Sequence, residues 1–246
     1  MSESRPLEAA RPNRRSLLRA GLALPMLGAL GAVSLTGVGY AAALTQAQRD
    51  AMSPDAVLAM MERGNKRFRR GEQQPRESLA EMRSSAKGQY PAAVILSCID
   101  SRAPAERIMD LGIGDIFNAR VAGNVANDDI LGSMEFACKL AGAKVAVVMG
   151  HTACGAIKGA IDNAELGNLT GLLAKIKPAV AATDYSGLRS AKNPEFVDRV
   201  AKKNVELTIA EIRTRSPVLA GLEAQGSLKI VGAMYRLDTG AVEFYR

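Results

Sequence analysis

The chain is poor in aromatic residues, which make up 4% of its 246 residues, and it has no tryptophan. Proteins that bind single-stranded nucleic acid need aromatic faces on which bases stack, so this class is disfavoured. The net charge of +7 does not indicate nucleic-acid binding either, because it is spread along the chain. Residues 1–43 hold five Arg and two Glu, and the rest of the chain carries 27 basic and 23 acidic groups. A mild, interspersed excess is typical of a solvated surface. We therefore expect no nucleic-acid partner.

Cysteine and histidine are also scarce, with three Cys and one His in the whole chain. A small, odd number of cysteines excludes a disulfide framework. The apolar share of 48% and the charged share of 23% exclude wholesale disorder, and the length suits one α/β domain or two small ones. With so few thiols and imidazoles, the position of each one becomes informative.

The N-terminal segment has the features of an export signal. Arg14-Arg15 followed by Leu17-Leu18 resembles the twin-arginine motif. The uncharged stretch Ala20–Ala43 contains several glycines and ends in three alanines, which matches the small-x-small cleavage pattern. We expect a signal peptide at residues 1–43, export through the twin-arginine translocase and a periplasmic mature protein. The alternative is an uncleaved membrane anchor, because the uncharged stretch is long enough to span a bilayer.

The mature part, residues 44–246, is predicted to form one domain in which strands alternate with helices. Apolar strand patterns lie at 92–96, 115–121, 144–149, 227–237 and 241–245. Helix patterns lie at 53–71, 77–87, 104–111, 129–141, 154–164, 169–183, 194–215 and 217–225, with Pro178 expected to bend or split the one that contains it. This alternation predicts an α/β fold with a mostly parallel central sheet, flanking helices and an antiparallel edge strand.

The scarce thiols and the one imidazole fall at the ends of predicted strands. Cys98 follows the first buried strand, His151 follows the third, and Cys154 opens the next helix. Ligands of parallel sheets gather at the carboxyl ends of the strands, and two thiolates with one imidazole suit a tetrahedral Zn²⁺. We expect His151 and Cys154 to share one face of a first helical turn. Three protein ligands leave a fourth position open, which is typical of a catalytic zinc, whereas Cys138 lies in an apolar helix stripe and is expected to be a small buried hydrophobe.

An acidic and a basic residue stand next to the first of these cysteines. Asp100 and Arg102 are two positions apart and can pair through two hydrogen bonds. On an ordinary surface this would be a local turn salt bridge of little energetic value. Beside a metal, Arg102 would keep Asp100 ionised and directed, so that Asp100 could accept the proton of a zinc-bound hydroxide.

These motifs resemble the signature of the β-class carbonic anhydrases. The resemblance rests on Cys98-Ile99-Asp100-Ser101-Arg102 and His151-Thr152-Ala153-Cys154-Gly155, and it extends through 111–117, 120–124, 155–159 and 232–240. It covers roughly residues 52–244. It implies the fold of that family, one zinc ion per subunit held by Cys98, His151 and Cys154, and reversible hydration of carbon dioxide to bicarbonate and a proton.

The resemblance also implies roles for further residues. Asp100 and Arg102 would form a gating pair, Gly155 would offer its backbone N–H to the substrate, and Phe117 would line a narrow apolar pocket for CO₂. Gln89 would reach into the site of a neighbouring subunit, because members of the family are dimers that often pair into tetramers. Some bacterial members use a Trp in an inhibitory bicarbonate pocket, and this chain has none.

Two other functions stay open on the sequence alone. The same hydroxide could hydrolyse COS or CS₂, since the difference would lie in the width of the access tunnel. A non-catalytic zinc-binding module is the other alternative, with Asp100 as the fourth ligand of a closed site. For the hydration of carbon dioxide we expect activity to favour alkaline pH, because two thiolates donate more charge to zinc than imidazoles do.

Overall fold

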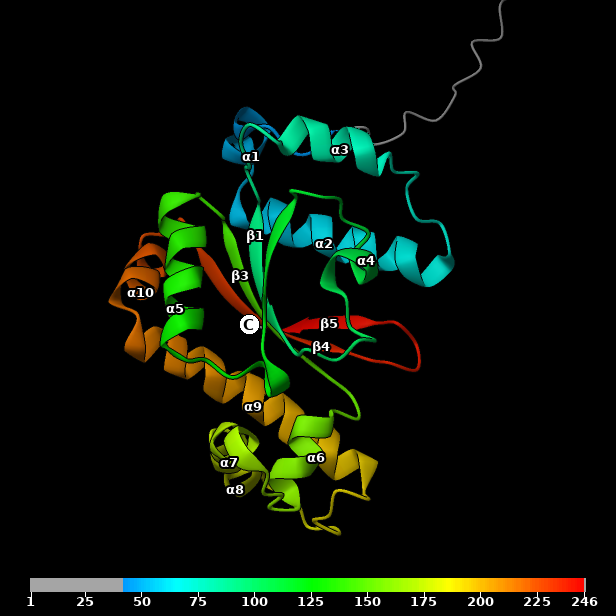
Figure 1. The fold of residues 1–246 in the computed structure, drawn as a ribbon, viewed down its shortest axis with the longest axis vertical. Coiled ribbons are helices and arrows are strands. Elements are labelled where there is room, and N and C mark those ends of the chain that lie inside the picture. The colour runs from blue at the N-terminus through cyan, green and yellow to red at the C-terminus, as the bar shows by residue number, and fades with distance from the viewer. Residues whose placement is uncertain (1–41, 246) are drawn as a thin grey trace, which may run out of the picture. The chain divides into compact units, whose positions relative to one another are not determined.

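The computed structural model describes residues 42–245, and these form a central five-stranded sheet in the order β2-β1-β3-β4-β5 (Figure 1). The strands are β1 (Ala93–Ser97), β2 (Ile116–Arg120), β3 (Val145–His151), β4 (Lys229–Tyr235) and β5 (Val242–Tyr245). The first four run parallel, and β5 pairs antiparallel with β4. The predicted fold class is confirmed. The predicted signal peptide lies, except for its last two residues, outside the described part of the chain.

Helices precede β1 and fill the connections between the parallel strands. They are α1 (Gln46–Ala51), α2 (Pro54–Arg70), α3 (Ser78–Ser85), α4 (Ala105–Ile108), α5 (Asp128–Glu135), α6 (Gly155–Ile161), α7 (Gly167–Ala174), α8 (Lys177–Ala182), α9 (Pro194–Arg215) and α10 (Pro217–Ala224), with a 3₁₀ turn η1 (Ala122–Asn124) and a π turn η2 (Phe136–Leu140). Within residues 42–245 no helix is both long and apolar enough to cross a bilayer.

Three local differences from the predicted helices have physical reasons. The helix expected at 169–183 is two helices, and Pro178 stands in the first turn of the second one, where its missing N–H costs no hydrogen bond. The helix expected at 129–141 continues as the π turn η2 after Glu135. Helix α1 was not predicted, although Thr45 and Gln48 form a capping box at its start.

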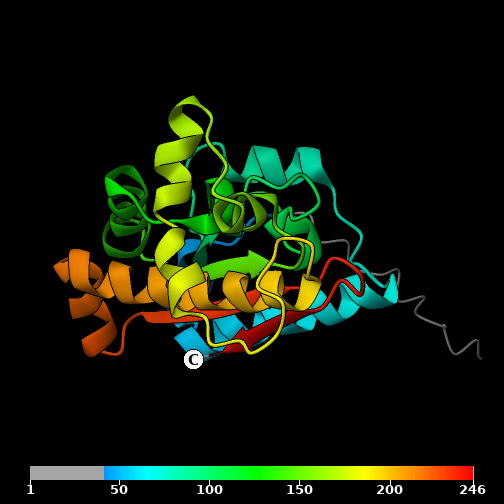
Figure 2. The same ribbon diagram turned by 90° about the horizontal axis from the view of Figure 1, so that it is seen from below.

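The central strands β1 and β3 are buried on both faces of the sheet, and alternate residues of each strand point to opposite sides. In β1, Val94 and Leu96 pack with α5, α9 and α10, whereas Ala93 and Ile95 pack with α2 and α4. Figure 2 shows the long helix α9 lying along the strands of the sheet. Helices therefore cover both faces of the sheet, and the carboxyl ends of the parallel strands lie between these two helical layers.

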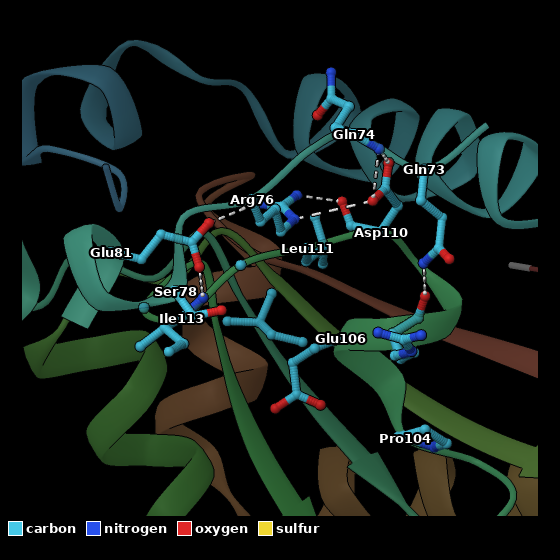
Figure 3. Close-up of a pocket in the computed structure, with 14 residues that line it drawn as sticks. Gln73, Gln74, Arg76, Ser78, Glu81, Pro104, Glu106, Asp110, Leu111 and Ile113 are labelled. Carbon is cyan, nitrogen blue, oxygen red and sulfur yellow. Dashed lines mark hydrogen bonds and ion pairs between the residues drawn. The ribbon is translucent and has the colours of Figure 1, made fainter. Parts of the chain in front are cut away.

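A buried ionic network fastens the connection between α2 and α3. The guanidinium of Arg76 donates to the Glu81 carboxylate at 3.0 Å and to the backbone carbonyl of Asp110 (Figure 3). The Asp110 carboxylate also pairs with Arg67. The side chains of Glu81 and Asp110 are 1% and 2% exposed, so these charges are compensated by partners rather than by water. A hollow of about 600 Å³ lies beside them, and it contains neither thiols nor the imidazole.

Candidate metal centre

Two adjacent strands and one helix start bring the predicted metal donors together. Cys98 directly follows β1, His151 is the last residue of β3, and Cys154 is the N-cap of α6. Because β1 and β3 are parallel neighbours, their carboxyl ends lie side by side. The donor atoms of the three residues all lie within 4.8 Å of one another, and all three side chains are buried. The topology thus delivers the set that the sequence pattern predicted.

The local geometry of His151 and Cys154 differs from the expected helical turn. His151 belongs to β3 and Cys154 precedes the first helical residue, so the expectation of one shared turn is wrong. The chain bends between them at Ala153, whose φ of 54° lies in the left-handed region that costs an L-residue roughly 1–2 kcal/mol. This bend brings the Cys154 thiol back toward the imidazole.

The donor set fits a tetrahedral zinc ion. Cys98 Sγ and Cys154 Sγ are 4.0 Å apart, and two sulfurs bonded to zinc at about 2.3 Å in a tetrahedron lie about 3.8 Å apart. His151 Nδ1 lies 2.9 Å from the Thr152 carbonyl, to which it can donate. His151 Nε2 is buried and has no hydrogen-bond partner, as expected of an atom whose partner is a metal.

The surroundings make one of the two thiols more acidic than the other. The pKa of Cys98 is lowered chiefly by a hydrogen bond from the Cys154 thiol and then, against the effect of burial, by His151 and by the Gly123 N–H. The pKa of Cys154 is raised by its hydrogen bond to Cys98 and by burial, while the N–H groups at the start of α6 act in the opposite direction. A metal cation would favour both thiolates.

Asp100 is held by Arg102 through both carboxylate oxygens. Arg102 donates from Nε to Oδ1 at 2.9 Å and from Nη2 to Oδ2 at 2.8 Å, and its backbone N–H donates to Oδ1 at 2.9 Å. These hydrogen bonds hold the pKa of Asp100 well below its usual range. Asp100 Oδ2 also lies 3.8 Å from His151 Nε2. The carboxylate is thus ionised, fixed and next to the metal donors.

Arg120, at the end of β2, fastens the loop after β1 and was not identified from the sequence. Its guanidinium donates to the carbonyl of Cys98 at 2.9 Å and to that of Asp100 at 2.6 Å. No spacing rule in the sequence points to such a side-chain-to-backbone contact across two strands, so this function of Arg120 emerges only from the structure.

An apolar hollow of about 240 Å³ opens beside the donor atoms. Its lining includes Cys98, Asp100 and Gly155, with Leu169 and Leu173 of α7 as the large apolar side chains. Such a space suits a small uncharged molecule.

Comparison with known proteins decides the family. A family model described as carbonic anhydrase matches residues 93–242. The chain belongs to the carbonic anhydrase family. It is 37% identical to carbonic anhydrase 2 of Mycobacterium tuberculosis over 194 residues, which cover 76% of this chain and 91% of that one. It is 34% identical to the carbonic anhydrase of Mycolicibacterium smegmatis over 197 residues, with 78% and 93% covered.

Solved structures place this carbonic anhydrase in the β class. The β-carbonic anhydrase CafA of Aspergillus fumigatus matches with a TM-score of 0.61 and 27% identity, over 78% of this chain and 89% of that one. A structure described as one of two tetrameric β-carbonic anhydrases of Sordaria macrospora matches with a TM-score of 0.57 and 26% identity, over 65% and 82%. The resemblance found in the sequence is confirmed for family and fold.

Two predicted substrate residues of this carbonic anhydrase lie outside its own apolar hollow. Gln89 lines a separate depression together with Ser85–Gly88, Ile113 and Ile116. Phe117 lies on the edge strand β2, where its ring meets that of Phe136 edge-on at 6.1 Å. Within the described residues of one chain, the structure therefore does not bring Gln89 or Phe117 to the hollow that Cys98, Asp100 and Gly155 line.

Proposed function

We propose that Cys98, His151 and Cys154 hold the zinc ion of this carbonic anhydrase, at which CO₂ is reversibly hydrated to bicarbonate and a proton. The observation that carries the proposal is the convergence of three buried donors beside an apolar hollow, with no fourth metal-binding side chain in the group among residues 42–245. Structural zinc sites have four protein ligands, whereas catalytic sites have three and an open position. When bound, zinc supplies a Lewis acid that makes water a nucleophile near neutral pH.

Asp100 is the hydrogen-bond acceptor of the site. Arg102 keeps its carboxylate ionised, so that Oδ2, on the side of His151, can accept a hydrogen bond from the nucleophilic water. Accepting that bond directs a lone pair of the water oxygen toward the carbon atom of CO₂. The two bonds from Arg102 would also hold the carboxylate back from the fourth position on the metal, which leaves that position to water.

The hollow selects for a small apolar substrate. Leu169 and Leu173 provide apolar contacts, and the exposed backbone of Gly155 at the start of α6 provides room and an N–H group for an oxygen atom that gains negative charge. The space beside Gly155 is open, since a Cβ at this residue would meet no atom within 4 Å.

The test is stopped-flow CO₂ hydration by the purified zinc-loaded protein between pH 6 and 9. We expect fast hydration that rises with pH, is lost on chelation and returns with zinc, and is absent in Cys154→Ser, which loses a donor. Full zinc occupancy without hydration would contradict the proposal and favour a non-catalytic zinc module. Turnover of COS or CS₂ in preference to CO₂ would favour the hydrolase alternative.

We propose further that two or four copies assemble, with Gln89 serving the site of a partner subunit. Support comes from the position of Gln89 outside the hollow of its own chain. It also comes from Ile113, which lines the Gln89 depression and is 48% exposed although apolar. The Sordaria macrospora relative is described as tetrameric.

We propose that the chain is exported to the periplasm by the twin-arginine route and cleaved after Ala43. The support is the sequence alone: Arg14-Arg15, the uncharged stretch after them and the three alanines that end it. Export in the folded state suits this chain, because its three cysteines are free thiols in the described structure and a bound metal would protect two of them from oxidation.

A further inference from the structure

Helix α9 contacts two segments around the metal donors, the His151–Cys154 loop and the 3₁₀ turn η1, which faces Cys98. It packs against β3, against the 3₁₀ turn η1 and against α6 (Figure 2). Two of its polar side chains, Asp198 and Asn204, are six positions apart, which is about 9 Å along a helix axis. Asp198 forms its hydrogen bond with the backbone between His151 and Cys154, and Asn204 forms its own with the backbone of η1, which faces Cys98.

Asp198 fixes the bend between His151 and Cys154. Its Oδ1 accepts a hydrogen bond of 3.0 Å from the N–H of Ala153, the residue with the left-handed backbone. A strained conformation of this kind persists only when its surroundings hold it. Without that acceptor, Ala153 can relax toward an ordinary conformation and carry the Cys154 thiol away from the imidazole.

Asn204 fixes the backbone that faces the other thiol. It is 3% exposed, and its Nδ2 donates to the carbonyl of Gly123 at 2.8 Å. The N–H of the same Gly123 donates to Cys98 Sγ at 3.4 Å. Gly123 has a φ of 69°, in the left-handed region that favours glycine, and a Cβ there would come within 2.5 Å of the Cδ1 atom of Ile176.

We propose that Asp198 and Asn204 are positioning residues that set the affinity of the site for its metal. Both are carried by one continuous 22-residue helix, so α9 fixes the turn η1, whose Gly123 N–H donates to Cys98 Sγ, relative to the His151–Cys154 loop. The proposal rests on the metal centre proposed above. It adds that the spacing of the donors is maintained from the helix and not by the strands alone.

The test compares zinc affinity among variants of the full protein by competition with a chelating dye. Loss of a residue that orients metal ligands lowers affinity about 10- to 100-fold, and we expect this for Asp198→Ala and Asn204→Leu. Asp198→Asn keeps an acceptor oxygen for the Ala153 N–H and should stay within about threefold of the parent. Thr208→Val is the matched control, because Thr208 is equally buried one turn further along α9.

The absorption spectrum of the cobalt-substituted protein gives a second readout that general destabilisation does not move. We expect Asp198→Ala and Asn204→Leu to shift its visible bands, and Asp198→Asn and Thr208→Val to leave them in place. Unchanged affinity and spectrum in folded Asp198→Ala would overturn the proposal. So would an equal loss of affinity in Thr208→Val, which would show that any change in α9 weakens the site.

Misfolding of a variant and failure of the proposed function can each be told apart from failure of the positioning proposal. Asp198 is only partly buried in the first turns of α9, so its variants decide the question even where Asn204→Leu does not fold. The CO₂ hydration rate of the parent protein is measured separately. A slow parent with position-dependent zinc affinity would contradict the proposed function and leave the positioning residues supported.

Discussion

Asp100 depends on a single neighbour, Arg102, for the direction in which its carboxylate points. The chain contains a second pair with the same spacing, Arg236 and Asp238, joined at 3.0 Å on the exposed turn between β4 and β5. The same kind of ion pair therefore serves differently at the two places. Beside the metal donors it fixes a hydrogen-bond acceptor, and on the surface it is worth little to stability.

This contrast gives a prediction for Asp100→Asn. The amide has the size of the carboxylate but is a poorer proton acceptor, so kcat/KM for CO₂ hydration should fall about 100-fold or more while zinc content stays at one per chain. Because the low pKa of Asp100 keeps it ionised throughout, the deficit should be the same at pH 7 and pH 9. Stopped-flow rates and metal analysis check this. Asp238→Asn is the control, and parental rates in both variants would reduce the Asp100–Arg102 pair to a turn salt bridge.

At the scale of elements, the contact between α2 and α4 depends on the absence of a side chain. A Cβ on Gly64 of α2 would lie 1.8 Å from the carbonyl oxygen of Met109, just after α4. The fit is between backbone and backbone, so no side-chain rearrangement can relieve it. The layer of helices on this face of the sheet is therefore set by a close approach that only glycine permits.

We predict that Gly64→Ala destabilises the protein by about 1–3 kcal/mol, despite the higher helix propensity of alanine. Gly132 of α5 is the matched control, because a Cβ there meets nothing within 4 Å. Gly132→Ala should raise the free energy of unfolding by about 0.5–1 kcal/mol. Urea unfolding of both variants at equal m-value measures the difference. Equal effects of the two substitutions would contradict the close approach of α2 to α4.

At the scale of the whole molecule, the proposed exchange of Gln89 between subunits has a sharp consequence. Gln89→Ala and Cys98→Ser should each impair every site in its own homodimer. In a mixed dimer, the Gln89→Ala subunit keeps its donors and receives Gln89 from the partner, which makes one intact site. We predict that unfolding and refolding the two variants together restores CO₂ hydration, whereas mixing Cys98→Ser with Cys154→Ser does not. No recovery in the first mixture would show that Gln89 acts within its own chain or not at all.

The export proposal is also tested on the whole chain. Replacing Arg14 and Arg15 by Lys keeps the charge but removes the paired arginines, so an active, metal-loaded precursor should remain inside the cell. Cell fractionation with N-terminal sequencing checks this, and the exported parent should begin at Leu44. An unchanged periplasmic yield of the double-Lys variant would refute the route, and a mature chain that begins before Leu44 would refute the cleavage site.

The sequence by itself determined the fold class, the strand ends at which the donors lie, and the family. These features depend on local information: the periodicity of apolar residues gives the strands and helices, and parallel strands necessarily end at one edge of a sheet. Cys98, His151, Cys154, Asp100 and Arg102 each lie next to a strand or helix boundary that the sequence indicates. Their convergence therefore follows once the sheet is known to be parallel.

Only the tertiary structure decided how the donors are held. No pattern in the sequence indicates the left-handed bend at Ala153, the hydrogen bonds of Arg120 to the loop after β1, or the hydrogen bond of Asn204 to Gly123. Asn204 and Gly123 are 81 positions apart. In the contacts of Arg120 and Asn204, packing brings a side chain of one element to the backbone of another. Because every residue has a backbone carbonyl, the sequence does not indicate which one will be the partner. The sequence therefore specifies which groups meet the metal, while the packing of α9 and β2 against the loops specifies where those groups stand.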